Sequence, residues 1–415
     1  MPKARTLKKP AVKPAKKSKL VAALADDYSD IGTFTVAESL AAESKSAATE
    51  SAVDADHRVR LLRKEVESLK RQLREQETGN QLIVQAIQDV WQEPAEVRLQ
   101  KLPKPGGPCG GGGRCSPADS EIAVLHLSDI HVGKRTATYD SAVAAERVAL
   151  LTAKTLEITA LRRSRARIDE CRIYLGGDMI EGEQIFPHQA HEIDASLLEQ
   201  AVKRAPEIVA DVVLSLANVF SRVKVVAVPG NHGRNGPKHT SSNPATNWDS
   251  VCYEVARRIV TSAARGSLAK DTGSGKDTGS DKDRITWDLP GDRAEEWYAL
   301  DRVAGWGCLL VHGHQIKGML GMPWYGFGKK VAGWVDTMPE GFDYVFTGHF
   351  HTAAAFDINH RTVLASGSTE SSNVYARENL AAAGYPKQRL CFFNSGYGML
   401  VDQPLYLSDD RRPNR

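Results

Sequence analysis

Five short segments of this chain place Asp, Asn or His side chains directly after apolar runs that are typical of β-strands. The runs are EIAVLHL, CRIYLG, VKVVAV, CLLV and YVF, and the segments are LSDIH, GGDMIEG, PGNHGR, VHGH and TGHFH. In α/β sheets the carboxyl ends of the strands meet at one edge, where loops present functional side chains. We therefore predict that the following side chains converge: Asp129, His131, Asp178, Asn231, His312, His349 and His351.

These residue types constrain the chemistry of the expected site. Carboxylate, amide and imidazole donors without a thiolate suit Mn, Fe, Zn or Ni. Seven ligands are too many for one tetrahedral ion and about right for two ions that share a carboxylate. Two metal ions about 3.5–4 Å apart catalyse in-line displacement at phosphorus. The pattern therefore predicts a centre for phosphoryl chemistry that holds two divalent ions.

The order Asp-x-His, Gly-Asp, Gly-Asn-His, His, Gly-His-x-His resembles the calcineurin-like metallophosphoesterase superfamily, over roughly residues 121–370. The resemblance implies a first metal held by Asp129, His131, Asp178 and His351, and a second held by Asp178, Asn231, His312 and His349. Asp178 would bridge the ions, and a metal-bridging hydroxide would attack phosphorus. The resemblance also implies that His232 is a catalytic residue that protonates the leaving group or stabilises the transition state.

One position departs from the superfamily pattern. An Asp or Glu usually follows Gly-Asn-His, and Gly233 stands there instead. A carboxylate in that place would orient and charge His232. Without it, His232 is expected either to be less basic or to take a partner from elsewhere. Arg234 is a candidate for binding a substrate phosphate, because a planar guanidinium suits that contact; the alternative is a surface arginine.

The first motif, LHLSDIHVGKR, resembles most closely the double-strand-break repair nuclease branch, which cleaves DNA phosphodiesters and usually uses manganese. The segment LASGSTESSNVYAREN also resembles phage-encoded phosphoesterases. We therefore expect an exonuclease-like phosphodiesterase with two manganese ions, and Fe, Zn or Ni as alternatives. Little chain follows residue 370 to form the DNA-capping domain of that branch. Two further functions stay open: a small-molecule phosphatase or cyclic-nucleotide phosphodiesterase, and a non-enzymatic scaffold.

The segment IKGMLGMPWYGFGKKVAGW lies between the last two motifs. It interleaves aromatic side chains with lysines: Trp324, Tyr325, Phe327 and Trp334 with Lys317, Lys329 and Lys330. Aromatic rings that stack on bases, beside cations that meet phosphates, form platforms for single-stranded nucleic acid. Trp324 and Tyr325 are therefore candidate substrate-binding residues. The alternative is that these aromatic rings belong to the hydrophobic core.

Composition changes along the chain predict its organisation. Residues 1–55 form a disordered arm, and the first 20 of them carry seven lysines, one arginine and no acid, which favours nucleic-acid binding or a solvated tail. Residues 56–100 are helical, residues 101–119 are a Pro/Gly linker, and residues 120–408 are the metallophosphoesterase domain. Within 59–73, apolar residues at heptad spacing indicate either a short coiled coil that forms a homodimer, which we favour, or a helix that lies on the catalytic domain. They are Val59, Leu62, Val66, Leu69 and Leu73.

The fold expected for the catalytic domain is a four-layer α/β sandwich of two mixed sheets flanked by helices. Helices are predicted over 141–162, 195–220 and 247–264, with crossovers between parallel strands. A polar segment over 265–284 is predicted to be a mobile insertion. The runs AAAFDI, RTVLAS, RLCFFN and GMLVD are predicted to form the second sheet.

No apolar run is long enough for a membrane span, and the start of the chain has no signal-peptide core, so we expect a cytoplasmic protein. The hydrophobic share of 41% and the net charge of +3 are ordinary for a globular chain. The cysteines are scattered, and the one close pair, Cys109 and Cys115, is expected to be linker thiols. Five further histidines are expected to be structural: His126, His188, His191, His239 and His360.

Overall fold

The computed structural model describes most of the expected catalytic domain and a few residues before it. The described residues are 120–186, 189–236, 246–271, 284–317, 323–371 and 385–408, with seven more between 61 and 70. The chain divides into two compact units, Met1–Gly79 and Asn80–Arg415. The predicted arm over 1–55 and the predicted linker over 101–119 lie outside the described residues.

The described residues of the first unit are helical. Lys70 pairs with Glu67 at 3.4 Å, one helical turn away, and Val66 is 47% exposed. The other four seam positions, Val59, Leu62, Leu69 and Leu73, lie outside the described residues. Dimerisation through residues 59–73 therefore stays a prediction.

The first sheet contains six strands in the order β11-β10-β1-β2-β3-β4. Its parallel strands are β1 (Ser120–Leu127), β2 (Arg167–Leu175), β3 (Arg222–Ala227) and β4 (Ile285–Asp288). β10 (Lys387–Asn394) pairs antiparallel with β1, and β11 (Gly398–Tyr406) pairs antiparallel with β10. The parallel strands bring the ends of the first three motif strands to the same edge.

The second sheet contains five strands in the order β5-β6-β7-β9-β8. They are β5 (Tyr298–Val303), β6 (Trp306–Val311), β7 (Tyr344–Thr347), β8 (Ala354–Ile358) and β9 (Arg361–Ala365). The central strands β6, β7 and β9 are parallel. The sequence patterns did not predict β4 or β5, which are short or alternate weakly.

Two of the four runs predicted for the second sheet lie in the first sheet instead. The runs RLCFFN and GMLVD form β10 and β11, which extend the first sheet and not the second. The five motif strands also do not share one sheet, because β1, β2 and β3 lie in the first and β6 and β7 in the second. The apolar pattern of a run predicts which of its residues are buried, but it does not predict which strand will pair with it.

Helices connect the parallel strands. α4 (Ser141–Arg162) joins β1 to β2, and its amino end is capped by Asp140, whose side chain accepts from the Val143 backbone N–H at 2.9 Å. α5 (Ala205–Ala217) joins β2 to β3, α6 (Trp248–Asp271) joins β3 to β4, and α7 (Trp324–Thr337) joins β6 to β7. Short helical turns cover Gln189–His191 and Pro290–Asp292.

Two helices differ from their predictions. The helix expected over 195–220 begins with a π-helical segment, Glu199–Arg204, and becomes α-helical at Ala205–Ala217. α6 ends at Asp271, so residues 265–271 of the predicted insertion are helical; residues 272–283 lie outside the described part. α6 therefore continues for seven residues past Ala264, where the predicted helix ended.

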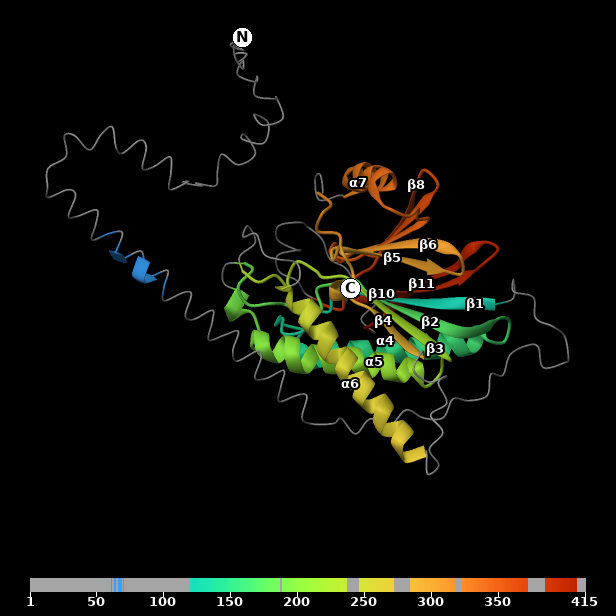
Figure 1. Ribbon diagram of the computed structural model, residues 1–415, viewed down its shortest axis with the longest axis horizontal. Helices are drawn as coiled ribbons and strands as arrows, with labels where there is room; N and C mark the ends of the chain where they lie inside the picture. Colours follow the sequence, from blue (N-terminus) through green and yellow to red (C-terminus); the bar gives the residue numbers. More distant parts are fainter. Residues whose placement is uncertain are drawn as a thin grey trace, which may run out of the picture. The chain divides into compact units, whose positions relative to one another are not determined.

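The elements stack in four layers, as predicted (Figure 1). α4, α5 and α6 cover one face of the first sheet through a core that includes Leu151, Val213 and Tyr253. The facing sides of the two sheets enclose a second core, which includes Tyr174 and Phe346. α7 covers the outer face of the second sheet. Among the described helices, none is both long and apolar enough to cross a bilayer.

Candidate metal centre

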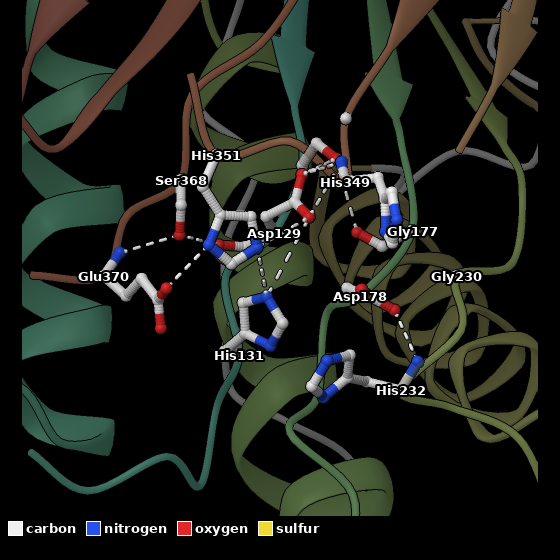
Figure 2. A network of polar contacts seen from close by, with 12 residues as sticks. Asp129, His131, Gly177, Asp178, Gly230, His232, His349, His351, Ser368 and Glu370 are labelled. Atoms are coloured by element: carbon white, nitrogen blue, oxygen red, sulfur yellow. Dashed lines mark hydrogen bonds and ion pairs between the residues drawn. The ribbon is translucent and has the colours of Figure 1, made fainter. Parts of the chain in front are cut away.

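The loops after β1, β2 and β3 face the loops after β6 and β7, so the ligand candidates come from both sheets. Asp129 is the second residue after the end of β1, and His312 is the first residue after the end of β6. Figure 2 shows Asp129, Asp178, His131, His349 and His351 gathered at this edge, with their side chains directed toward one another. The structure thus brings the predicted ligands together, across two sheets.

An unusual backbone conformation marks the ligand loops. In the described part of the chain, seven non-glycine residues have positive φ, a region that costs about 1–3 kcal/mol for such residues. Five of the seven are predicted ligands: Asp129 (54°), His131 (54°), Asp178 (54°), His349 (69°) and His351 (53°). Such strain persists only where the surroundings enforce it, and it concentrates at functional sites. The strained backbone at these residues therefore lowers the stability of the fold, and it orients their side chains toward the candidate site.

The histidine rings are oriented by partners on their far nitrogen. The Nδ1 of His131 lies 2.8 Å from Glu181 Oε2, and the Nδ1 of His351 lies 2.6 Å from Glu370 Oε1. The Nδ1 of His312 lies 2.7 Å from the Gly176 carbonyl oxygen. Because each Nδ1–H donates to an acceptor, each Nε2 keeps its lone pair for a cation.

The first predicted ligand set is compact and buried. The Nε2 atoms of His131 and His351 lie 3.1 Å apart, and His351 Nε2 lies 3.3 Å from Asp129 Oδ1. Both oxygens of Asp129 also accept from the His349 backbone N–H at 3.0 Å, which ties the two sheets together. Asp129 and His131 are completely buried.

The second predicted set is built in the same way. His312 Nε2 lies 3.0 Å from Asp178 Oδ2 and 3.1 Å from Asn231 Oδ1. Asp178 has potential ligand atoms within 4.8 Å of those of His312 and His349. A Cβ on Gly230 would overlap the Asp178 carboxylate, so only glycine fits this position. Asp178 also lies in a second such group with His131, which makes it the residue that links both sets.

This donor arrangement fits two divalent cations. Lone-pair atoms that face one another at about 3 Å repel unless a cation or a proton lies between them. Oxygen and imidazole donors without thiolate match Mn, Fe, Zn or Ni. The first cation would be held by Asp129, His131, Asp178 and His351, and the second by Asp178, Asn231, His312 and His349.

His232 lies beside these ligands. Its ring contacts a carboxylate that does not come from position 233, where Gly233 stands. Its Nδ1 lies 2.9 Å from the Glu181 carbonyl oxygen and 3.3 Å from Glu181 Oε2. The backbone N–H of His232 donates to Asp178 Oδ1 at 2.7 Å. Of the two expectations for a chain with Gly233, the structure places His232 with a carboxylate from elsewhere. That carboxylate belongs to the loop after β2.

Electrostatics keep His232 charged. Burial by itself lowers the pKa of His232, but the Glu181 and Asp178 carboxylates outweigh it and raise that pKa to about 9. Burial disfavours the charged form of Glu181 too, yet His232 and Lys134 lower its pKa. Cations held by Asp178 would offset part of the effect on His232. An imidazolium in this place can donate a proton to a leaving group.

Several supporting residues escaped the sequence reasoning. Glu181 lies three residues after Asp178 within the quoted GGDMIEG segment, so its position was a usable signal. Lys134 and Glu370 also lie within segments that resemble known families, but only the tertiary structure joins them, at 2.7 Å. Asp249, at the start of α6, accepts from the backbone N–H groups of Asp178, Met179 and Gly230. Burial and the Asp178 carboxylate raise the pKa of Asp249 to about 6.

The candidate substrate contacts are only partly supported by position. Arg234 is half-buried, and its charge acts on His314, whose ring lies 5.5 Å from the ring of His312. Trp324 is 47% exposed and Tyr325 75% exposed on α7. Phe327 and Trp334 are buried on the side of α7 that packs against the second sheet. The interpretation of these two rings as part of a platform was therefore wrong.

Comparisons with known proteins reveal only distant likenesses. No protein-family model matches the sequence, and no curated protein matches it significantly. Zinc-bound Vps29 from Entamoeba histolytica is 13% identical, with a TM-score of 0.30, over 69% of this chain and 99% of that one. A predicted phosphoesterase from Streptococcus pneumoniae is 9% identical, with a TM-score of 0.27, over 69% and 98% of the two chains. An archaeal phosphodiesterase is 9% identical, with a TM-score of 0.30, over 69% and 99%. Similarity at this level does not bear on substrate or activity.

Proposed function

We propose that this chain is a dinuclear-metal phosphodiesterase that acts on nucleic acid. The observation that carries the proposal is the position of Asp178, which lies within ligand distance of His312 and His349 on one side and of His131 and His232 on the other. The rings of His131 and His232 lie 4.6 Å apart. A proton donor next to a site for two cations matches the needs of phosphoester hydrolysis.

Each residue has a distinct task in the proposed reaction. When bound, two divalent cations would neutralise charge on the phosphoryl oxygens and acidify the attacking water. His232 would donate a proton to the leaving oxygen, a task that typically contributes 10²–10⁴-fold to the rate. Glu181 would keep His232 protonated and oriented through its contact with Nδ1. The burial of Asp129 and Asp178 would strengthen every interaction within the site.

The choice of nucleic acid as substrate rests on α7 and on the sequence. Trp324 and Tyr325 are exposed on this helix together with Lys329 and Lys330. Beneath them, the ring of Phe327 lies 5.4 Å from that of Phe350, which in turn lies 5.2 Å from that of His349. Aromatic contacts thus connect the exposed face of α7 to a ligand of the proposed centre. The first motif and the basic arm also favour a DNA substrate, with manganese as the metal.

The experiment that tests this function measures Mn²⁺-dependent hydrolysis of labelled single- and double-stranded DNA. Bis(4-nitrophenyl) phosphate and 4-nitrophenyl phosphate are measured in parallel. Asp178→Asn should abolish all activity, because Asp178 belongs to both ligand sets. Asp211→Asn, an equivalent change at an exposed position on α5, is the matched control and should remain active.

The pattern of substrates separates the alternatives. DNA cleavage that is lost in Asp178→Asn would support a nuclease. Hydrolysis of the small esters alone would instead favour a small-molecule phosphatase or a cyclic-nucleotide phosphodiesterase. No hydrolysis of any ester by the Mn²⁺-loaded protein would favour the scaffold alternative and contradict the proposal.

The contribution of α7 needs its own variant. Replacing Trp324 and Tyr325 with alanine should raise the KM for single-stranded DNA about tenfold or more, since base stacking contributes about 1–3 kcal/mol per base. Activity on bis(4-nitrophenyl) phosphate should stay close to normal. Tyr397→Ala is the control, because Tyr397 is 81% exposed in the β10–β11 turn at the opposite end of the first sheet. An unchanged KM would exclude α7 as the platform.

A further inference from the structure

The two ligand sets are supported in different ways. Behind the first set, both histidines donate their Nδ1–H to a buried carboxylate, Glu181 for His131 and Glu370 for His351. Behind the second set, His312 donates to a neutral backbone carbonyl, that of Gly176. A carboxylate behind a ligating histidine raises the basicity of the ring and fixes its orientation more strongly than a carbonyl does.

A buried lysine organises the two carboxylates. Lys134 Nζ lies 2.7 Å from Glu370 Oε2 and 4.0 Å from Glu181 Oε2, and its side chain is 14% exposed. The lysine is held in place because its backbone N–H donates to the His131 carbonyl oxygen at 3.0 Å. Two carboxylates buried this close together need a cation between them to remain ionised. Lys134, Glu181 and Glu370 therefore form a charge triad with a formal net charge of −1.

The charges of the ligands themselves add to the difference. The first set contains Asp129 in addition to the shared Asp178, whereas the second set contains the neutral Asn231 in the corresponding role. On the second side, the positive charge of Arg234 reaches His314, which lies beside His312 and His349. Each of these features favours a divalent cation in the first set over the second.

We infer that the charge triad makes the set of Asp129, His131 and His351 the tighter of the two cation sites, so that the two ions bind in sequence. The inference rests on the metal centre of the proposed function but not on its substrate. The first cation would remain bound at concentrations at which the second exchanges. The second site, bounded by Asn231, His312 and His349, would then be the one filled last.

Calorimetric titration of the full-length, metal-free protein with Mn²⁺ tests this inference. Two binding steps of different affinity are expected. His351→Ala should remove the tighter step, and His349→Ala should remove the weaker one and leave the tighter. Glu370→Gln should weaken the tighter step about ten- to hundredfold and leave the weaker step unchanged, the usual effect of losing a partner behind a ligand.

Controls keep the result interpretable. Glu181→Gln is the second variant, should Glu370→Gln fail to fold, and it should act on the same step. Glu183→Gln is the matched control in the same loop, where the carboxylate accepts from the Leu197 backbone N–H at 3.4 Å, and it should change neither step. Equal affinities at both sites, no Mn²⁺ binding, or equal weakening of both steps in Glu370→Gln would overturn the inference. Two unequal steps in a protein that hydrolyses no ester would contradict the proposed function and leave the inference intact.

Discussion

At the residue scale, one carboxylate from outside the Gly-Asn-His segment supports two histidines of the proposed centre. Glu181 contacts both His131 and His232, so one side chain from the loop after β2 supports a metal-ligand candidate and the proposed acid. Position 233 has no room for a side chain, because a Cβ on Gly233 would overlap Asn247 Oδ1. The identity of residue 233 is thus a packing requirement.

The charge of His232 gives the reaction a pH dependence. The pKa of His232 is raised to about 9, so the ring is protonated below that pH and can act as an acid. With cations bound, the pKa falls, and kcat should decrease as pH rises through a value at or below about 9. The measurement is kcat against pH on a diester with a poor leaving group. His232→Asn should lower kcat by about 10²–10⁴-fold and lose this alkaline decrease. A variant that keeps the alkaline limb would assign it to another group.

A second histidine should control stability in acid. His126 is completely buried against Phe346, and neither ring nitrogen has a hydrogen-bond partner among the residues that the structure describes. Burial and the charge of Arg389 lower its pKa to about 3. The unfolded chain therefore binds a proton near pH 6.5 that the folded chain does not. The contribution of His126 to the free energy of unfolding is therefore fully present above pH 6.5. It falls by about 1.4 kcal/mol for each pH unit below that value.

Replacing His126 with phenylalanine should remove that dependence. Urea unfolding at pH 7.5 and pH 5.0 should show that His126→Phe loses about 2 kcal/mol less than the parent protein over this interval. His360→Phe, at an exposed turn position, is the control and should behave like the parent. The same pH dependence in His126→Phe would show that other groups cause the acid sensitivity.

At the element scale, the loops and not the helices carry the specialised geometry. The five ligand candidates with positive φ all follow β1, β2 or β7, and the described helices contain no predicted ligand. Asn247 lies just before α6. Its side-chain amide donates to the Gly230 carbonyl oxygen at 2.9 Å and accepts from the Asp249 backbone N–H at 2.8 Å. This contact positions the loop that carries Asn231 and His232.

Two glycines should therefore respond in opposite ways to substitution. Gly233→Asp introduces a carboxylate directly after His232, but it should destabilise the protein by about 1–3 kcal/mol through overpacking against Asn247. It should not raise kcat, because Glu181 already contacts His232. Gly328→Ala on α7 has open space around its Cβ and should stabilise by about 0.5–1 kcal/mol. Denaturant unfolding measures both, and a stable, more active Gly233→Asp would refute this account.

At the scale of the whole molecule, polar contacts join the two sheets at several places. Asp301 on β5 accepts from Arg172, Tyr174 and Lys224 of the first sheet at 2.7–3.0 Å. Arg389 of β10 donates to the carbonyl oxygens of Ala354 and Ala365 in the second sheet. The proposed centre adds a further connection, since its ligands belong to both sheets.

Metal binding should accordingly stabilise the fold. Mn²⁺ at about 100 times the Kd of one site should add about 2.7 kcal/mol through that site, which corresponds to roughly 4–5 °C in Tm for a domain of this size. Differential scanning calorimetry with Mn²⁺ and then with a chelator measures the shift. Asp178→Asn should lose most of the stabilisation, because Asp178 belongs to both ligand sets. An equal shift in Asp178→Asn would mean that Mn²⁺ binds elsewhere.

The amino-acid sequence was enough to predict the layer architecture and to name the residues of the proposed centre. Strand-forming runs followed by Asp, Asn and His are local patterns, and each could be recognised without knowing its neighbours in space. α4 was predicted at its observed bounds for the same reason, because its spacing and its end at Arg162 are local. The ligand types also limited the metals, since donor chemistry does not depend on the fold.

Only the tertiary structure decided which strands pair and which side chains support the centre. β10 joins the first sheet through hydrogen bonds to β1, which lies more than 250 residues earlier in the chain, as the pairing of Arg389 with His126 shows, and β11 pairs in turn with β10. Glu370 meets Lys134 and His351 only because β9 and β1 end at the same edge. Phe327 and Trp334 are buried because α7 packs on the second sheet. These contacts join distant segments, and hydrophobic burial and backbone pairing in three dimensions determine them.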